Sequence, residues 1–215
     1  MAYQRSWRWV TVVKVGFIVE GKTERKIVES AAFRELLSNN HLSLVSPVIN
    51  ADGNGNLLPK KLKESITVLQ SNGAEKIFIV TDLDEDACIT KTRDRIGASA
   101  NTIVIIAVKQ IEAWFLADSF TMSTLLREDF SYEWPEKENA PFEKLKSLFL
   151  DKTNRGVGTK DTFTARMLKY GFSIQRAAAH PNCPSATYFL NKLKQTAPPP
   201  RWGSNKTAPP SGRGA

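Results

Sequence analysis

Apolar segments rich in β-branched residues alternate with segments of helical periodicity along the first half of the chain. This pattern predicts four strands, at residues 10–19, 43–49, 76–81 and 102–108. Ile27, Val28, Leu36 and Leu37 recur at helical spacing, so we predict an amphipathic helix over residues 24–38 with Thr23 as its cap. A second helix carries Leu58, Leu62, Ile66 and Leu69 on one face and ends near Gly73.

Strands that alternate with helices imply right-handed crossover connections between parallel neighbours. The sequence therefore predicts an α/β fold with a mainly parallel sheet and helices on both of its faces. Residues 1–118 would form this core, because the periodicity becomes purely helical after Asp118. Helical segments at 121–127, 142–150, 161–170 and 188–194 predict a helical addition, residues 119–195, that packs on the core.

Residues 196–215 have a different composition from the rest of the chain. They contain five of the 11 prolines, three of the 12 glycines, three basic residues and no acid. Such a segment has too few apolar residues to form a packed core, so we predict a disordered basic tail.

Composition adds constraints on the environment and the partner. The 30 lysines and arginines exceed the 22 acids, for a net charge of +8, which favours a polyanion such as nucleic acid, although solubility is an alternative reason. No apolar run reaches the ~20 residues of a membrane span, so no membrane partner is expected. Cys88 and Cys183 lack metal-ligand or disulfide-scaffold spacing, which favours a reducing cytoplasm.

Carboxylates follow three of the predicted strands. Glu20 ends the first, Asp82 and Asp84 end the third, and Glu112 follows the fourth, while Glu24 lies one helical turn after Glu20. The carboxyl ends of parallel strands meet at one edge of the sheet, where ligands bind in open α/β folds. Asp82 and Asp84 are two apart and would point to one side of an extended segment.

Crowded carboxylates repel one another unless a cation lies between them. Hard oxygen ligands favour Mg²⁺ or Mn²⁺, and two such ions ~4 Å apart would support phosphodiester hydrolysis. The alternative is that these acids are ordinary helix caps, because Asp and Glu are common at helix N-termini. Recurrence at a single sheet edge favours the metal interpretation.

The order of these motifs resembles the Toprim domain of topoisomerases, primases and OLD (overcoming lysogenisation defect) nucleases. The matching elements are Glu20-Gly21, the glycine-bearing loop Gly53 to Gly55, and Asp82-Leu83-Asp84. EGKTE, at residues 20–24, is similar to the OLD-like branch. The runs IEAWFLAD, at residues 111–118, and Cys183-Pro184-Ser185 resemble small bacterial Toprim-related proteins, so that the resemblance covers roughly residues 14–195.

The resemblance implies metal-dependent cleavage of nucleic acid, with Glu20, Asp82 and Asp84 as the core acidic set. Glu24 matches the second acid of the OLD-like motif, and Glu112 would serve a second ion. It further implies a role in defence against phage or plasmid DNA. OLD nucleases carry an ATPase domain. In this sequence Gly16 to Thr23 matches the letters GxxxxGK[ST], but its first four residues fall in the strand predicted at 10–19 rather than in a phosphate-binding loop, so an ATPase would have to be a separate partner.

Basic residues near these acids complete the candidate site. Lys109 precedes Glu112 by three residues and is a candidate for stabilising the phosphate or the leaving oxygen, with a surface lysine as the alternative. Four basic residues around Gly156-Val157-Gly158 are candidates for binding the phosphate backbone: Lys152, Arg155, Lys160 and Arg166. A solvated loop would have the same composition.

Three function classes remain open from the sequence. The first is a Mg²⁺- or Mn²⁺-dependent nuclease that acts on DNA or RNA. The second is a non-catalytic nucleic-acid or protein-binding module whose acids hold a structural ion. The third, strand transfer or primer synthesis, would require further domains for which 215 residues leave little room. Trp114 and Phe115 fit either a hydrophobic core or a base-stacking surface.

Overall fold

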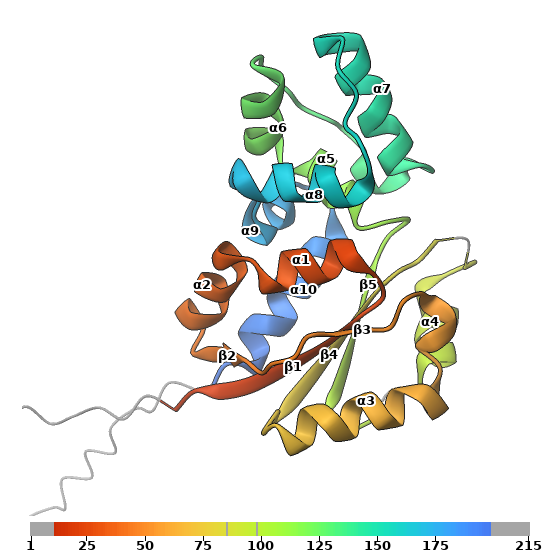
Figure 1. Cartoon of the computed structure of the whole chain (residues 1–215), viewed down its shortest axis with the longest axis vertical. Coiled ribbons are helices and arrows are strands. Elements are labelled where there is room, and N and C mark those ends of the chain that lie inside the picture. The colour runs from red at the N-terminus through yellow and green to blue at the C-terminus, as the bar shows by residue number, and fades with distance from the viewer. Residues whose placement is uncertain (1–10, 85, 98, 199–215) are drawn as a thin grey trace, which may run out of the picture.

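A parallel five-stranded sheet forms the centre of the fold (Figure 1). The computed structural model describes residues 11–84, 86–97 and 99–198. The main path of the sheet is β2-β1-β4-β5, and β3 also pairs with β1. The strands are β1 (Val13–Val19), β2 (Leu42–Leu44), β3 (Ile49–Asn50), β4 (Lys76–Asp82) and β5 (Thr102–Ala107). All of the pairings are parallel, which confirms the predicted α/β fold.

Helices cover both faces of the sheet because each central strand is apolar on both sides. Ile18 and Ile79 face α3 (Pro59–Ser71) and α4 (Ile89–Ile96) in one hydrophobic cluster. Phe17 and Phe78, whose rings stack at 5.1 Å, belong to a second cluster on the opposite face. That face is covered by α1 (Lys22–Glu29), α2 (Ala31–Asn39) and α10 (Pro184–Thr196).

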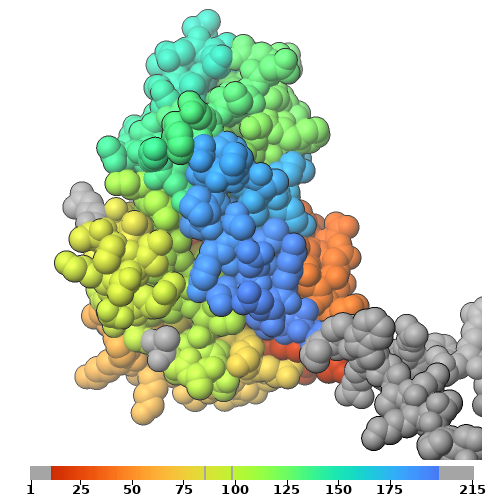
Figure 2. Space-filling model, turned by 180° about the vertical axis from the view of Figure 1, so that it is seen from behind, coloured from red at the N-terminus to blue at the C-terminus, as the bar shows by residue number. Residues whose placement is uncertain are grey.

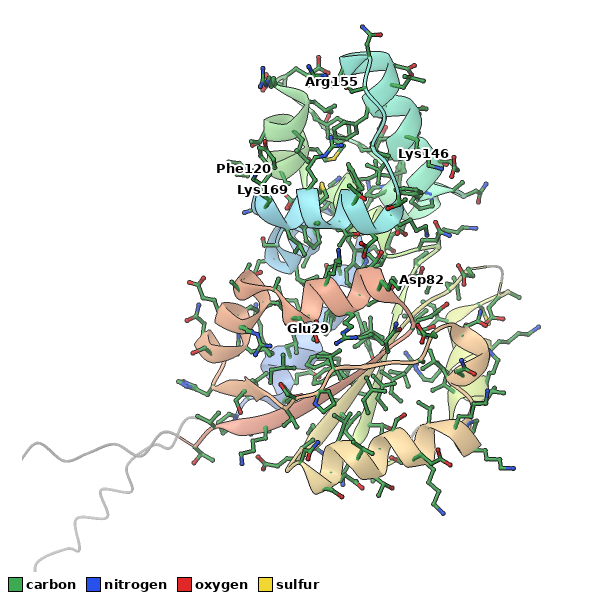
Figure 3. All side chains as sticks on the ribbon, in the orientation of Figure 1. Glu29, Asp82, Phe120, Lys146, Arg155 and Lys169 are labelled. Atoms are coloured by element: carbon green, nitrogen blue, oxygen red, sulfur yellow. The ribbon has the colours of Figure 1, made fainter. Side chains whose placement is uncertain are left out.

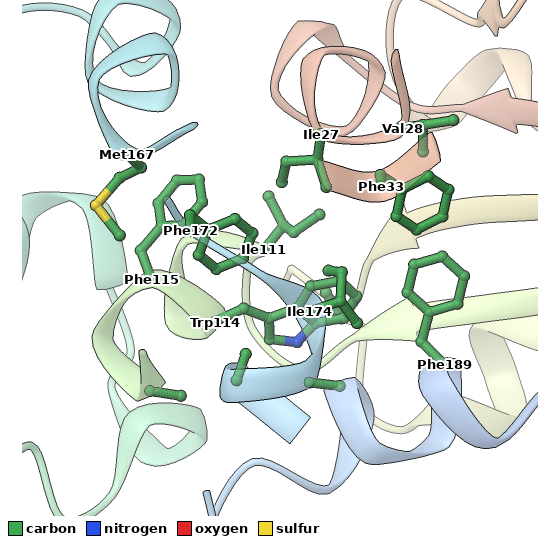
Figure 4. Close-up of a cluster of buried hydrophobic side chains, with 14 of the residues drawn as sticks. Ile27, Val28, Phe33, Ile111, Trp114, Phe115, Met167, Phe172, Ile174 and Phe189 are labelled. Carbon is green, nitrogen blue, oxygen red and sulfur yellow. The ribbon is translucent and has the colours of Figure 1, made fainter. Parts of the chain in front are cut away.

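The remaining helices extend the second cluster beyond the sheet. They are α5 (Glu112–Ala117), α6 (Ser119–Leu126), α7 (Pro141–Thr153), α8 (Lys160–Lys169) and α9 (Ile174–Ala179). Trp114 stacks on Phe189 of α10, and Phe115 packs edge to face against Phe172 (Figure 4). Both Trp114 and Phe115 are fully buried, so the core interpretation of these residues is confirmed. One continuous core therefore joins these helices to the sheet. In Figure 2 the residues of α9 and α10, in blue, lie at the surface below the teal and green residues of α6 and α7.

Two short 3₁₀ helices lie in the connecting loops. η1 (Asn54–Asn56) follows β3, and η2 (Pro135–Lys137) precedes α7. The segments predicted at 121–127, 142–150 and 161–170 are confirmed as α6, α7 and α8, with bounds that differ by one to three residues. No helix among the described residues is long and apolar enough to cross a membrane.

The predicted helix over residues 24–38 is wrong as a single element. Ser30 has extended backbone angles and its hydroxyl accepts a hydrogen bond from the Phe33 amide at 3.2 Å, so it ends α1 and caps α2. Thr23 is also not the cap of α1, because the helix begins at Lys22 and Gly21 occupies the capping position. The apolar periodicity continues across the break, and for that reason it did not reveal the two helices.

Other elements differ from the prediction for local reasons. The strand predicted at 43–49 is two short strands, β2 and β3, separated by a segment that contains Pro47, which has no amide hydrogen to donate to a sheet. Two helices, α4 and α9, were not predicted, and α10 begins at Pro184 rather than at Tyr188. All but the first three residues of the predicted tail, 199–215, lie outside the described part of the chain.

Candidate functional site

The end of β1 places two carboxylates beside the sheet edge. Glu20 follows the last residue of the strand, and its amide still donates to the Val80 carbonyl of β4 at 2.9 Å. Its Oε2 accepts hydrogen bonds from the Thr81 hydroxyl at 2.5 Å and the Asp82 amide at 3.2 Å. Glu24, on the first turn of α1, is buried and accepts from the Gly21 amide at 3.1 Å. Sequence analysis did not select Thr81. Its hydroxyl could have been chosen as a candidate, because Thr81 directly precedes Asp82 at the end of the predicted strand.

The end of β4 holds Asp82 and Asp84 in different ways. Asp82 is the last residue of the strand, and its buried Oδ1 accepts from the Ile111 amide at 2.8 Å. Asp84 has a positive φ of 47°, so the two aspartates do not lie on one extended segment as expected. Instead the Asp84 amide donates to the Lys109 carbonyl at 2.9 Å, and this bond ties the loop after β4 to the loop after β5.

Glu112 brings an unusual feature to the same edge. It is the first residue of α5 and is only 1% exposed. Its Oε2 forms an ion pair with the Lys160 ammonium at 3.2 Å, whereas its Oε1 is buried and has no hydrogen-bond partner among the described residues. A buried carboxylate oxygen without a partner is costly, so this atom is available to accept from a donor or to bind a cation.

Burial and the charges of neighbouring acids raise the pKa of two of these carboxyl groups, Asp82 and Glu24. The pKa of Asp82 is raised well above its ordinary value, first by burial and then by the charges of Glu24, Glu112, Glu20 and Asp84. The pKa of Glu24 is raised to about 7, mainly by burial, with further contributions from the charges of Glu112 and Glu20. The charges of acids from three strand ends therefore act on one another, as the parallel sheet predicted.

The donor set fits a hard divalent cation in chemical type, because all five groups present carboxylate oxygens. The unpartnered Glu112 Oε1 supports this fit. Among the described residues, however, no three acidic, histidine or cysteine side chains are arranged to coordinate a metal ion as they stand. Hydrogen bonds to protein donors hold Glu20, Glu24 and Asp82, and the ion pair with Lys160 holds Glu112. Binding of a cation would require some of these side chains to turn.

The raised pKa of Glu24 predicts how the metal-free protein responds to pH. Its folded pKa of about 7 exceeds the ordinary 4.5, so folding is penalised as pH rises through this window. We expect Glu24→Gln to stabilise the protein at pH 8, by on the order of 2 kcal/mol, and to change little at pH 4. Urea unfolding in EDTA at both values measures this, with exposed Glu64→Gln as the control. Equal stabilisation at both pH values would contradict the assignment.

The four basic residues predicted to bind nucleic acid do not form one group. Lys160 reaches the carboxylates through its ion pair with Glu112. Lys152, Arg155 and Arg166 instead line a separate recess near the ends of α6, α7 and α8. Figure 3 places Arg155 at the far end of the helical layer from Asp82. The position of Lys160 depends on packing of α8 against α1, where Lys26 and Asp161 form an ion pair at 2.9 Å.

A polar recess of about 500 Å³ opens beside Asp84. Lys109 lies in its wall with Asp84, in agreement with the predicted proximity of this lysine to the acids. Sequence reasoning did not single out the other polar residues of the wall, which come from four separate loops: Asn54, Asp86, Gln110 and Asn139. The recess is large enough for a phosphate group and its neighbouring sugar, and Lys109 supplies positive charge there.

The IEAWFLAD and Cys183-Pro184-Ser185 runs meet in the core behind the site. The Trp114 indole donates to the Ser185 hydroxyl at 2.8 Å, and that hydroxyl donates to Glu136 at 2.5 Å. Glu136 also accepts from the Ser185 amide at the start of α10. Burial is the main cause that raises the pKa of the Cys183 thiol, so this cysteine is unsuited to act as a nucleophile. The network fixes α5, and with it Glu112, relative to α10.

Comparison with known proteins does not assign the chain to a family. No family model matches the sequence, and neither curated proteins nor solved structures gave a significant match.

Proposed function

We propose that the protein is a Toprim-type nuclease that uses Mg²⁺ or Mn²⁺, as one or two ions, to hydrolyse phosphodiester bonds in DNA or RNA in the cytoplasm. The observation that carries this proposal is the gathering of acids from three strand ends around the buried Asp82, beside the buried Glu112 Oε1, which has no hydrogen-bond partner among the described residues. Acids that served only as helix caps would not need to accumulate charge at one buried point.

Each acidic residue has a role that follows from its position. Glu20, Asp82 and Asp84 would hold the principal cation, while Glu24 and Glu112 would contribute to a second one. When bound, such a cation lowers the pKa of a water molecule and neutralises charge on the phosphate. The buried surroundings of Asp82 and Glu112 strengthen these interactions because they exclude competing water.

Two lysines lie beside different members of the acidic group. Lys109 lies beside Asp84 in the polar recess, where it would bind a non-bridging or leaving oxygen of the phosphate. Lys160 is paired with Glu112 and neutralises part of the charge of the acidic group. A cation that competes for Glu112 would release this ammonium toward the substrate. Both lysines would therefore stabilise negative charge that develops during hydrolysis.

A non-catalytic module with a structural ion is the second candidate. The hydrogen bonds of Glu20 and Asp82 favour it, because they join the end of β1 to the end of β4, and β4 to the segment before α5, and so give these acids a structural role. Such a module would bind nucleic acid or a protein without cleaving either. In both cases an ATPase partner and a role in phage defence are further proposals, and an ATP-driven gate would act from a separate chain.

Metal binding can be measured without any activity assay. We expect saturating Mg²⁺ or Mn²⁺ to raise the melting temperature by about 5 °C or more over EDTA, because a ligand that binds only the folded state stabilises it. Glu112→Gln should reduce this shift, since it removes one of the proposed ligands. Exposed Glu64→Gln on α3 should retain the full shift. The absence of any shift in the unmodified protein would count against both candidates.

The function itself is tested by cleavage. Supercoiled plasmid, linear duplex, single-stranded DNA and RNA are each incubated with the purified protein in Mg²⁺, Mn²⁺ or EDTA, in parallel with Asp82→Asn. Metal-dependent cleavage that the variant lacks would support the nuclease and identify its substrate. If the protein binds the metal but cuts none of these substrates, the binding module becomes the better description.

A further inference from the structure

The recess near the ends of α6, α7 and α8 is rich in basic residues. It has a volume of about 440 Å³, and its wall contains Arg127, Lys152, Arg155 and Arg166 together with the exposed ring of Tyr170. Arg127, which sequence analysis did not select, ends α6, and Arg155 lies just after α7. Cations near helix C-termini stabilise those helices, but this effect does not require four of them around one recess.

The four basic groups differ in how far they are already neutralised. Lys152 is paired with Glu128, and the Arg166 guanidinium lies 5.4 Å from the centre of the Phe149 ring. Arg127 and Arg155 are exposed, and neither has an ion-pair partner among the described residues. Two guanidinium groups are thus free to bind a ligand with paired acceptor oxygens, as phosphate has.

The length of α7 sets the separation between this recess and the carboxylates. Lys160, which contacts Glu112, lies 5.7 Å from the Phe142 ring near the start of the helix. Lys152, in the wall of the recess, lies ten residues after Phe142 on α7, which corresponds to ~15 Å at ~1.5 Å per residue. One nucleic-acid strand rises ~3.4 Å per nucleotide, so this distance spans roughly four to five nucleotides.

We infer that the recess is a second phosphate-binding site, which holds a nucleic-acid strand roughly four to five nucleotides away from the phosphate at the carboxylates. This inference rests on the proposed nuclease function and specifies its substrate as a polynucleotide rather than a nucleotide or dinucleotide. Arg127 and Arg155 bind the backbone, and Tyr170 offers an exposed ring for stacking on a base. An acidic peptide has no base to stack on the Tyr170 ring, and it carries no phosphates at a regular spacing that would reach the carboxylates.

The test measures binding in EDTA, where cleavage cannot occur. Fluorescence anisotropy compares the unmodified protein with Arg127→Gln/Arg155→Gln, using labelled single-stranded DNA of three and of twelve nucleotides. We expect the double variant to bind the 12-mer about tenfold more weakly, and the slope of log affinity against log salt to fall by about 1.4. The 3-mer should bind both proteins weakly, because it is too short to reach both sites.

Lys60→Gln/Lys63→Gln provides a control of equal charge on α3, on the opposite face of the sheet (Figure 1). The inference is overturned if this control weakens 12-mer binding equally, if the recess variant binds like the unmodified protein, or if the 12-mer does not bind at low salt. Competition by polyglutamate as strong as that by DNA would also overturn it. Because no metal is present, these outcomes are independent of whether Asp82 supports cleavage.

Discussion

Asp82→Asn is expected to lower metal-dependent cleavage by about 10³-fold or more, while the metal-free protein keeps its fold and gains stability. Asparagine has nearly the same shape as aspartate and its carbonyl oxygen can still accept the hydrogen bond from the Ile111 amide. What the variant loses is the negative charge. Neighbouring acids and burial already disfavour that charge, as the raised pKa of Asp82 indicates.

Two measurements are needed because activity alone does not separate the candidates. Cleavage is compared with the exposed control Asp94→Asn on α4, and the free energy of unfolding is measured by urea titration in EDTA and in Mg²⁺. A nuclease predicts lost cleavage with equal or higher stability in EDTA. A structural ion predicts no metal-dependent cleavage by either protein, and a variant that is less stable than the unmodified protein in Mg²⁺. Full cleavage by Asp82→Asn would refute the proposed catalytic role of this residue.

The part of the site that the sequence predicted follows from the geometry of parallel sheets. Strand periodicity located the ends of β1 and β4 to within one residue, and parallel strands bring their carboxyl ends to one edge. Glu20 and Asp82 could therefore be placed together without a structure. Asp84 reaches the same region for another reason, a positive-φ turn held by the Lys109 carbonyl. Alternation along an extended strand did not predict that turn.

What the sequence did not predict depends on contacts between distant segments. Lys160 reaches Glu112 because α8 packs on α1, where Thr164 and Thr23 meet in the core and Lys26 pairs with Asp161 at the surface. No local pattern encodes that packing. Helix α4 was missed for a related reason, since only Thr92 and Ile96 are buried and its sequence lacks a wide apolar face. Similarly, the Trp114–Ser185 hydrogen bond joins residues 71 positions apart.

Asp118→Ala should be the most destabilising of the substitutions considered, with a loss of about 2–4 kcal/mol from the donors that lose their acceptor. Asp118 ends the IEAWFLAD run and is fully buried. It caps α6 by accepting from the Thr121 amide and hydroxyl, and it accepts from the Ser173 amide and from Arg176 at 2.8 Å. Alanine would leave the buried amides of Thr121 and Ser173 without this acceptor, whereas the Arg176 side chain is 37% exposed and can be solvated.

The matched control is a pair that lies at the surface. Asp161 and Lys26 also form an ion pair, but their side chains are 48% and 36% exposed. Asp161→Ala should therefore cost less than about 1 kcal/mol, because water solvates both groups when the pair is broken. Urea unfolding followed by circular dichroism measures both variants at neutral pH. If Asp118→Ala cost no more than Asp161→Ala, the buried network would not hold the helical layer together.

The same substitution links the stability of the helical layer to the candidate site. Asp118 adjoins the C-terminal end of α5, the helix that begins at Glu112, so its loss should loosen the placement of that carboxylate. We therefore expect Asp118→Ala to reduce the rise in melting temperature caused by Mg²⁺, although Asp118 is not a proposed ligand. An undiminished rise would mean that the Trp114–Ser185–Glu136 network alone positions α5. In that case the acids at the sheet edge would not depend on α6 and α9.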